Sequence, residues 1–186
     1  MRVIAGKYRG VALRGGKGPQ FRPTAQVVKG SIFDSLYAEI QSAVILDLFA
    51  GSGSLGIEAL SRGASKARFI EQDKSALKAL RTNLERCHIT KEQSDVRNTD
   101  AVRFLEKAVK SGEVYDIIFA DPPYASELGK KLADMINDSG RSICRYFIVE
   151  SGKEFDIQEG GCLEKLRTRK FGQTIITYFR VKDSTG

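Results

Sequence analysis

The chain has 186 residues, of which 41% are hydrophobic and four are proline, so it is long enough for one sizeable core and short for two. Its three cysteines lack metal-binding spacing, which argues against a disulfide framework and a zinc site, and we expect no metal. No apolar run reaches the length of a membrane span or has the form of a signal peptide. We therefore expect a cytoplasmic protein without a membrane partner.

The net charge of +7 comes entirely from the N-terminal part of the chain. Residues 1–33 contain seven basic residues and no acidic one, whereas the remainder balances 23 basic against 23 acidic residues. Neutralising phosphates with basic side chains releases counterions, so this distribution favours a polyanionic partner over an ordinary solvated face. The side chains that we expect to contact RNA are Arg2, Lys7, Arg9, Arg14, Lys17 and Arg22.

The first residues predict a small structural unit ahead of the main body. Arg2–Ala5 and Gly10–Leu13 flank a glycine-containing turn and are typical of a β-hairpin, and Gly15–Pro19 follow as a loop. We therefore divide the chain into an N-terminal basic β-hairpin arm with its loop (residues 1–20) and a body (residues 21–186). A helix capped by Thr24 is expected next, and its predicted apolar face consists of Val27, Val28, Ile32, Phe33 and Leu36.

From Ala43 onward, short apolar strands alternate with amphipathic helices, which predicts an α/β fold with a parallel sheet covered on both faces. The predicted strands are Val44–Asp47, Ala67–Glu71, Asp95–Asn98, Asp116–Ala120 and Tyr146–Glu150. The predicted helices are Ser54–Arg62, Lys74–Cys87, Ala101–Lys110 and Glu127–Asn137. No helix separates Cys162–Thr168 from Gln173–Val181, so the sheet is expected to end in an antiparallel hairpin.

A glycine-rich loop, Asp47 to Gly56, lies between the first strand of the body and the next helix, where open α/β sheets bind ligands. Gly51, Gly53 and Gly56 fit the spacing of a dinucleotide loop, so a nicotinamide cofactor, S-adenosylmethionine and a purely structural turn are all considered. The Asp47 carboxylate would repel a pyrophosphate but not a cationic sulfonium with its ammonium group. The loop therefore favours S-adenosylmethionine.

Two further acids follow strands at the same edge of the predicted sheet. Glu71 can accept hydrogen bonds from a ribose diol, which both classes of cofactor carry. Asp100 is placed either to accept from an adenine amino group or to cap the following helix, and the sequence leaves both roles open.

The most specific motif is Asp121-Pro122-Pro123-Tyr124, which follows an apolar strand. Two prolines lack N–H donors, so the turn offers the Asp121 carboxylate and the Pro122 carbonyl as acceptors for an amino group. An exocyclic base amine is a poor nucleophile, and two acceptors can orient it toward a methyl donor. Tyr124 offers an aromatic surface for a base, although a Pro-Pro turn with a core tyrosine is the structural alternative, and His88 need not participate.

With these motifs, the chain resembles class I S-adenosylmethionine-dependent methyltransferases, and within them the RsmD family of 16S ribosomal RNA guanine-N2 methyltransferases. The resemblance also rests on Arg2-Val3-Ile4-Ala5-Gly6, Arg22-Pro23-Thr24, Glu58 to Ala64 and Phe171-Gly172-Gln173-Thr174. Two positions depart from the family pattern, because Val27 stands where an arginine is usual and Gly30 where a glutamate is usual.

The resemblance implies a Rossmann-like fold and a set of roles. The residues that it places around S-adenosylmethionine are Asp47, Phe49, Gly51, Gly53, Glu71 and Asp100. Asp121, Pro122, Pro123 and Tyr124 would hold the guanine, and the basic hairpin would bind ribosomal RNA within an assembling small subunit and its proteins. We expect the chain to act as a monomer.

Three other functions are compatible with parts of the pattern. A DNA adenine methyltransferase more often has asparagine at the position of Asp121 and carries a target-recognition domain, for which this chain has no room. An NAD-dependent dehydrogenase is disfavoured by Asp47 and by the lack of an evident second substrate domain. A non-catalytic RNA-binding module would explain the basic arm but would not require Asp121 to Tyr124.

Overall fold

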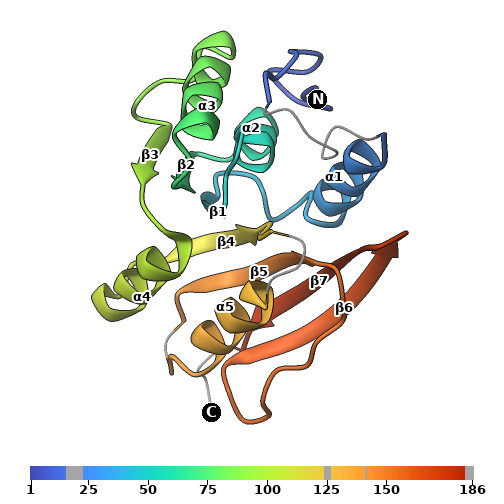
Figure 1. Ribbon diagram of the computed structural model, residues 1–186, viewed down its shortest axis with the longest axis vertical. Helices are drawn as coiled ribbons and strands as arrows, with labels where there is room; N and C mark the ends of the chain where they lie inside the picture. Colours follow the sequence, from blue (N-terminus) through green and yellow to red (C-terminus); the bar gives the residue numbers. More distant parts are fainter. Residues whose placement is uncertain (16–22, 124–126, 141, 183–186) are drawn as a thin grey trace.

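The computed structural model describes residues 1–15, 23–123, 127–140 and 142–182, in which helices and strands alternate (Figure 1). The helices are α1 (Pro23–Ser35), α2 (Ser54–Ser61), α3 (Lys74–Arg86), α4 (Ala101–Ser111) and α5 (Leu128–Asn137). The strands are β1 (Val44–Leu48), β2 (Lys66–Glu71), β3 (Ser94–Asn98), β4 (Tyr115–Ala120), β5 (Cys144–Ser151), β6 (Leu163–Phe171) and β7 (Thr174–Val181). The strands and helices predicted from Val44 onward are confirmed, with small differences at their ends.

The strands form one seven-stranded sheet in the order β3-β2-β1-β4-β5-β7-β6. Strands β1 to β5 are parallel, whereas β7 is antiparallel to β5 and β6 is antiparallel to β7. The predicted α/β class and its antiparallel C-terminal hairpin are therefore confirmed. The order reverses between β1 and β4, which is where open parallel sheets have a ligand-binding crevice.

Helices cover both faces of the sheet, as the near-continuous apolar strands require. Helices α1, α2 and α3 pack on one face, where the rings of Phe33 and Phe119 lie 5.6 Å apart. Helices α4 and α5 pack on the other face, where Phe147 stacks on Phe179 at 6.0 Å. None of the helices within the described ranges is long and apolar enough to cross a bilayer.

The prediction for the apolar face of α1 is wrong at one position. Val28, Ile32, Phe33 and Leu36 are buried as expected, but Val27 is 60% exposed. Val27 precedes Val28 by one residue, and this turns its side chain about 100° around the helix, away from the sheet. Helix α1 begins at Pro23, so Thr24 lies inside its first turn and not at the predicted cap position; the Thr24 side chain lies outside the part of the structure that is described.

The N-terminal segment, residues 1–15, has less strand pairing than a β-hairpin. It contains one antiparallel bridge, between Arg2 and Ala12, and the Val3 N–H donates to the Val11 carbonyl at 3.1 Å. The segment folds back on itself and buries Val3, Tyr8 and Leu13 in the same core as α1 and α2. It is therefore packed against the body through an apolar face of its own.

Helix α2 holds this segment by specific polar contacts. The Glu58 carboxylate accepts from the backbone N–H groups of Ile4 at 2.8 Å and Ala5 at 3.1 Å. At Gly6 the chain passes so close to α2 that an added Cβ would lie 1.7 Å from the Ser61 carbonyl oxygen. Any other residue at position 6 would force the two segments apart.

Glu58 is also the centre of a buried ion pair. Its side chain is fully buried and lies 3.0 Å from the ammonium of Lys29, which is itself only 3% exposed, while Arg62 donates to the other carboxylate oxygen at 2.9 Å. Burial lowers the pKa of Lys29, and Glu58 partly opposes this effect. Removing the Glu58 carboxylate is costly, because its hydrogen-bond donors and the Lys29 ammonium would stay buried without an acceptor.

We expect Glu58→Ala to lower the free energy of unfolding by about 3–5 kcal/mol, because it leaves the Lys29 charge buried and unpaired. Urea unfolding followed by circular dichroism measures the change. Glu85→Ala removes an exposed glutamate from α3 and should change the value by less than about 0.5 kcal/mol. Equal stability of the two variants would contradict a structural role for Glu58.

Candidate active site at the carboxyl edge of the sheet

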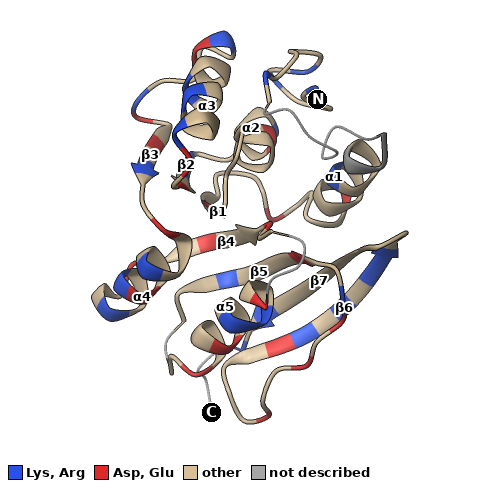
Figure 2. Cartoon of the chain, in the orientation of Figure 1, with Lys and Arg blue, Asp and Glu red and all other residues tan. Residues whose placement is uncertain are grey.

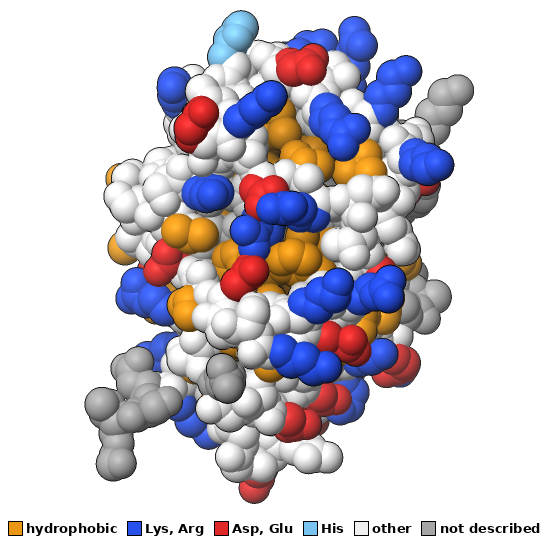
Figure 3. All heavy atoms as spheres, turned by 90° about the vertical axis from the view of Figure 1, so that its left-hand side faces the viewer, with side chains coloured by type: hydrophobic (Ala, Val, Ile, Leu, Met, Phe, Trp, Pro, Cys, Tyr) orange, Lys and Arg blue, Asp and Glu red, His pale blue; other side chains and the backbone are white. Residues whose placement is uncertain are grey.

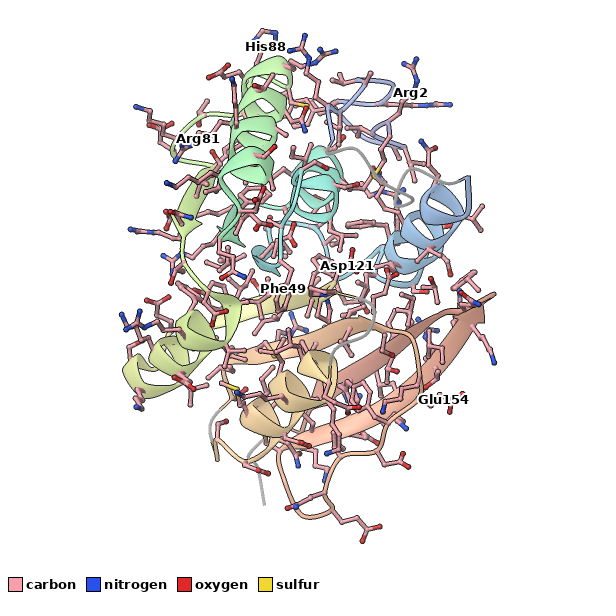
Figure 4. The ribbon with its side chains drawn as sticks, viewed as in Figure 1. Arg2, Phe49, Arg81, His88, Asp121 and Glu154 are labelled. Carbon is pink, nitrogen blue, oxygen red and sulfur yellow. The ribbon has the colours of Figure 1, made fainter. Side chains whose placement is uncertain are left out.

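The two sequence motifs lie on adjacent strands at the same edge of the sheet. Strand β1 leads into the glycine loop, β4 leads into Asp121, and Leu48 pairs with Ala120 where both strands end. Figure 4 shows Phe49 and Asp121 near each other at this edge, whereas His88 lies far away beyond α3. The fold therefore brings the predicted cofactor loop and the predicted amine-binding turn together.

The glycine loop turns sharply before α2 begins. Phe49, Gly51 and Gly53 all have positive φ angles, of 63°, 55° and 82°. A side chain at Gly53 would also meet Leu80, 2.4 Å away from an added Cβ, so only glycine fits there. Phe49 adopts this conformation despite its side chain, at a cost of roughly 1–2 kcal/mol, which is typical of backbone held in place at a binding site.

Asp47 lies beneath this loop with 1% of its surface exposed. One carboxylate oxygen accepts from the Gly56 N–H at 2.9 Å, which anchors the first turn of α2. The pKa of Asp47 is raised to about 7. Burial is the main cause, the charges of Asp121 and Glu71 contribute, and the hydrogen bond from Gly56 opposes the rise. A buried carboxyl group with neighbouring acids and no basic side chain paired to it in the described ranges fits a cationic ligand such as a sulfonium with an ammonium group.

Glu71, at the end of β2, supports the loop from the other side. It accepts three backbone N–H groups at 2.8 Å: Gly51 on one carboxylate oxygen, and Gln72 and Asp73 on the other. A carboxylate has about four acceptor positions, so one position, on the oxygen that Gly51 contacts, remains for a ligand hydroxyl. A ribose diol that used both oxygens would have to displace one of these backbone contacts.

Asp100 caps α4, which was one of its two expected roles. Its carboxylate accepts from the Arg103 N–H at 2.9 Å, and the side chain is exposed at the end of β3. A contact between Asp100 and an adenine amino group stays a prediction.

Asp121 follows β4 and reaches solvent, while Pro122 is buried and Pro123 is exposed. Protein crowded around the Asp121 carboxylate removes water from it and raises its pKa to about 6. Tyr124 lies outside the described residues, so its predicted stacking surface stays a prediction.

Glu150 belongs to the same site, although no motif in the sequence pointed to it. It lies at the end of β5, next to Asp121, because Ala120 pairs with Val149 one residue earlier. The pKa of Glu150 is raised to about 8, mainly by burial and also by the charge of Asp121, while the Thr174 hydroxyl, which donates at 3.4 Å, opposes the rise. The signal in the sequence was an acid at the end of an apolar strand, the same position that Glu71 occupies.

The predicted RNA-binding side chains form a separate surface on the N-terminal segment. Arg2, Lys7, Arg9 and Arg14 are exposed and make no ion pair with a described residue, and Figure 2 shows no acidic residue along this segment. Figure 3, which faces α3 and α4, shows basic and acidic side chains interspersed instead. Lys17 and Arg22 lie outside the described residues.

Asn83 connects this basic surface to the glycine loop. Its buried side chain amide donates to the Arg14 carbonyl at 2.6 Å and to the Ser52 carbonyl at 2.9 Å, and its oxygen accepts from the Arg14 N–H at 2.7 Å. Asn83 lies on α3, so one helix joins the two surfaces. No cluster of metal-binding side chains occurs in the described parts of the chain.

Comparisons with known proteins identify a family and several relatives of this chain. The model of the family described as conserved hypothetical protein 95 matches residues 1–180. YlbH of Bacillus subtilis, proposed to be an rRNA methyltransferase, is 37% identical over 97% of this chain and 98% of its own. Ribosomal RNA small subunit methyltransferase D of Haemophilus influenzae is 38% identical over 73% of this chain and 70% of its own. The solved structure of yhhF from Escherichia coli, proposed to be a methyltransferase, superimposes with a TM-score of 0.83 at 31% identity, covering 98% of both chains.

We expect affinity for S-adenosylmethionine to rise about tenfold or more between pH 6 and pH 8. The pKa of Asp47 is raised to about 7, so below this value a cationic ligand can bind only when the Asp47 carboxyl group loses its proton, whereas above it the carboxylate is already ionised. Calorimetric titration across this range measures the effect. S-adenosylhomocysteine lacks the sulfonium charge, so its affinity should change less over this pH range. Equal pH dependence of the two ligands would contradict the electrostatic role of Asp47.

Proposed function

The chain belongs to the RsmD family, the family described as conserved hypothetical protein 95, and we propose that it methylates the exocyclic N2 amine of a guanine in 16S ribosomal RNA. S-adenosylmethionine is the methyl donor of this reaction. The observation that carries the proposal is the position of Asp121 and Pro122 beside the glycine loop, on the neighbouring strand.

The Asp121 turn is suited to bind an amine. The turn supplies the Asp121 carboxylate and the Pro122 carbonyl, so an amino group can donate both of its hydrogens and direct its lone pair toward the cofactor. The pKa of about 6 keeps most Asp121 ionised at neutral pH, so the carboxylate is available as an acceptor. Asp121 or water can then take the proton that the newly methylated nitrogen loses.

The other residues of the site hold the methyl donor. S-adenosylmethionine, when bound, supplies an electrophilic methyl group on a positively charged sulfur. Asp47 provides a negative charge beneath the glycine loop, and Glu71 fixes the loop backbone at Gly51 while retaining one acceptor position. The same buried Asp47 carboxylate would repel the pyrophosphate of a nicotinamide cofactor, which disfavours a dehydrogenase.

The basic N-terminal segment supports RNA as the substrate. Its exposed cations belong to the segment that Glu58 anchors to α2, and Asn83 joins this segment to the glycine loop. The family relationship supports guanine N2 as the target, and we propose an assembling small subunit as the natural substrate. Within that subunit, ribosomal proteins would form part of the recognised surface.

The main test is methyl transfer from radiolabelled S-adenosylmethionine to small ribosomal subunits from cells that lack this protein. The wild-type protein should produce labelled N2-methylguanosine. Asp121→Ala should lower the rate about 10²- to 10³-fold or more while leaving cofactor affinity within a few fold, because it removes an acceptor for the reacting amine. Asp156→Ala removes a 93% exposed carboxylate and serves as control. Label in DNA or protein instead of RNA would overturn the proposal.

Neutralising Arg2, Lys7 and Arg9 together to glutamine should weaken RNA binding most at low salt. If each side chain neutralises one phosphate, the slope of log affinity against log salt concentration should become shallower by about 2. Filter binding over a range of salt concentrations measures this slope. The matched control replaces Arg103, Lys107 and Lys110, exposed cations of α4, and should leave the slope unchanged. An unchanged slope in the N-terminal variant would reject this surface as an RNA contact.

A further inference from the structure

The order of the strands places the cofactor on one side of Asp121. Asp47, Glu71 and Asp100 belong to β1, to β2 and to the turn after β3, which continue the sheet in one direction from β4. Methyl transfer requires the lone pair of the amine nitrogen, which is perpendicular to the ring of the base, to point at the methyl carbon, so the ring cannot occupy the space of the cofactor over β1 to β3. The space on the other side of Asp121, over the ends of β5 and β7, is left for the ring.

Glu150 is the first side chain in that direction. Phe119 and Ile148 pair across β4 and β5 and lie in the same core cluster, facing α1. Successive side chains alternate between faces, so Asp121 and Glu150, two residues further along, also share the α1 face. The Glu150 side chain is partly exposed at this edge of the sheet.

Strand β7 pairs with β5 at Glu150 and makes one long hydrogen bond to its carboxyl group. Glu150 pairs with Ile176, and Thr174, two residues earlier on β7, donates its hydroxyl to Glu150 at 3.4 Å. Thr174 is part of the Phe171-Gly172-Gln173-Thr174 motif that the sequence shares with the RsmD family, and β7 begins with it. The motif thus contributes one contact to the side chain beside Asp121.

Nothing in the described structure neutralises Glu150. Glu150 forms no ion pair with a described residue, and the charge of Asp121 raises the pKa of Glu150. A half-buried carboxyl group between an acid and a hydroxyl destabilises the unliganded fold unless it remains protonated. Such a group is better satisfied when a ligand offers it a hydrogen-bond donor.

Guanine offers that donor in the right position. In guanine, the ring atom next to the N2 amine on the Watson–Crick edge is N1, which carries a hydrogen. In adenine and cytosine, the ring nitrogen next to the exocyclic amine is an acceptor. An ionised carboxylate can only accept, so one beside the amine-binding residue distinguishes guanine from the other amino bases.

We propose that Glu150, oriented by Thr174, accepts a hydrogen bond from N1–H of the target guanine while Asp121 and Pro122 hold its N2 amine. This inference rests on the proposed function and adds the residue that selects the base. The hydrogen bond from N1–H stabilises the ionised form of Glu150, so guanine binds to the form that has no hydrogen to donate to the ring acceptor of another amino base.

The test compares guanine with 2-aminopurine at the nucleotide that the methyl-transfer experiment identifies, in reconstituted small subunits. 2-Aminopurine has the same amine, but its N1 is an acceptor and it lacks O6. We expect wild-type protein to prefer guanine by about 10²-fold or more in kcat/KM. Glu150→Ala should lower kcat/KM for guanine about 10- to 100-fold and change that for 2-aminopurine much less.

Glu150→Gln provides a second, isosteric variant. Its amide can donate to the N1 acceptor, so 2-aminopurine should become a better substrate, and the preference for guanine should fall about tenfold or more. Glu154→Gln, which changes an exposed acid that Figure 4 shows away from Asp121, should keep the wild-type preference. Cofactor affinity should stay within a few fold in every variant, because Glu150 lies on the side of Asp121 away from Asp47.

The outcomes separate the two proposals. If wild-type protein makes no N2-methylguanosine, the proposed function is wrong, and the role of Glu150 is wrong with it. If wild-type protein makes it but both Glu150 variants keep the wild-type preference, Glu150 does not read the base. Loss of cofactor affinity in Glu150→Gln would also overturn the inference, because it would place Glu150 on the cofactor side.

Discussion

All five parallel strands end at one edge of the sheet, and each delivers a carboxyl group there. Like charges in a poorly hydrated space repel strongly, so the structure must neutralise them or protonate them. On the cofactor side, backbone N–H groups do this: Gly56 donates to Asp47, three residues donate to Glu71, and Arg103 donates to Asp100. On the other side, no described backbone N–H donates to Asp121 or Glu150, and both have raised pKa values. Within the described part of the chain, the two acids that receive no backbone N–H are therefore those best able to accept from a substrate.

The N-terminal segment is held in place by helices α2 and α3, which also contact the glycine loop. Helix α2 starts directly after the glycine loop, and its Glu58 anchors Ile4 and Ala5. Asn83 adds a second connection, from Arg14 to the loop at Ser52. The buried Glu58 and Asn83 thus hold the basic N-terminal segment at a fixed distance from the carboxyl groups at the ends of the parallel strands. A protein that modifies one position in a large nucleic acid requires this kind of fixed spacing.

Local patterns in the sequence predicted much of this structure. Apolar strands of four to six residues alternating with amphipathic helices identified the sheet, and the glycine loop after β1 and the turn after β4 lie at one edge of it, as predicted. The N-terminal segment was harder, because its partners Glu58 and Asn83 lie more than fifty residues away and only tertiary packing joins them. Val27 was misplaced because one apolar residue fits a predicted helix face as well as its neighbour does. Glu150 was overlooked because its role depends on its pairing with β7, which follows it in the chain but lies beside it in the sheet.

The antiparallel hairpin leaves β6 as an edge strand with one side unpaired. Such an edge can recruit a strand from another molecule and begin aggregation. Here Arg167, Arg169 and Lys170 make the edge strongly cationic, and a register shift between Lys165 and Arg167 makes the strand irregular. Two copies that approached edge to edge would bring like charges together along a strand that is not straight. The protein can therefore keep an open-edged sheet at the high concentrations of a cell without polymerising through it.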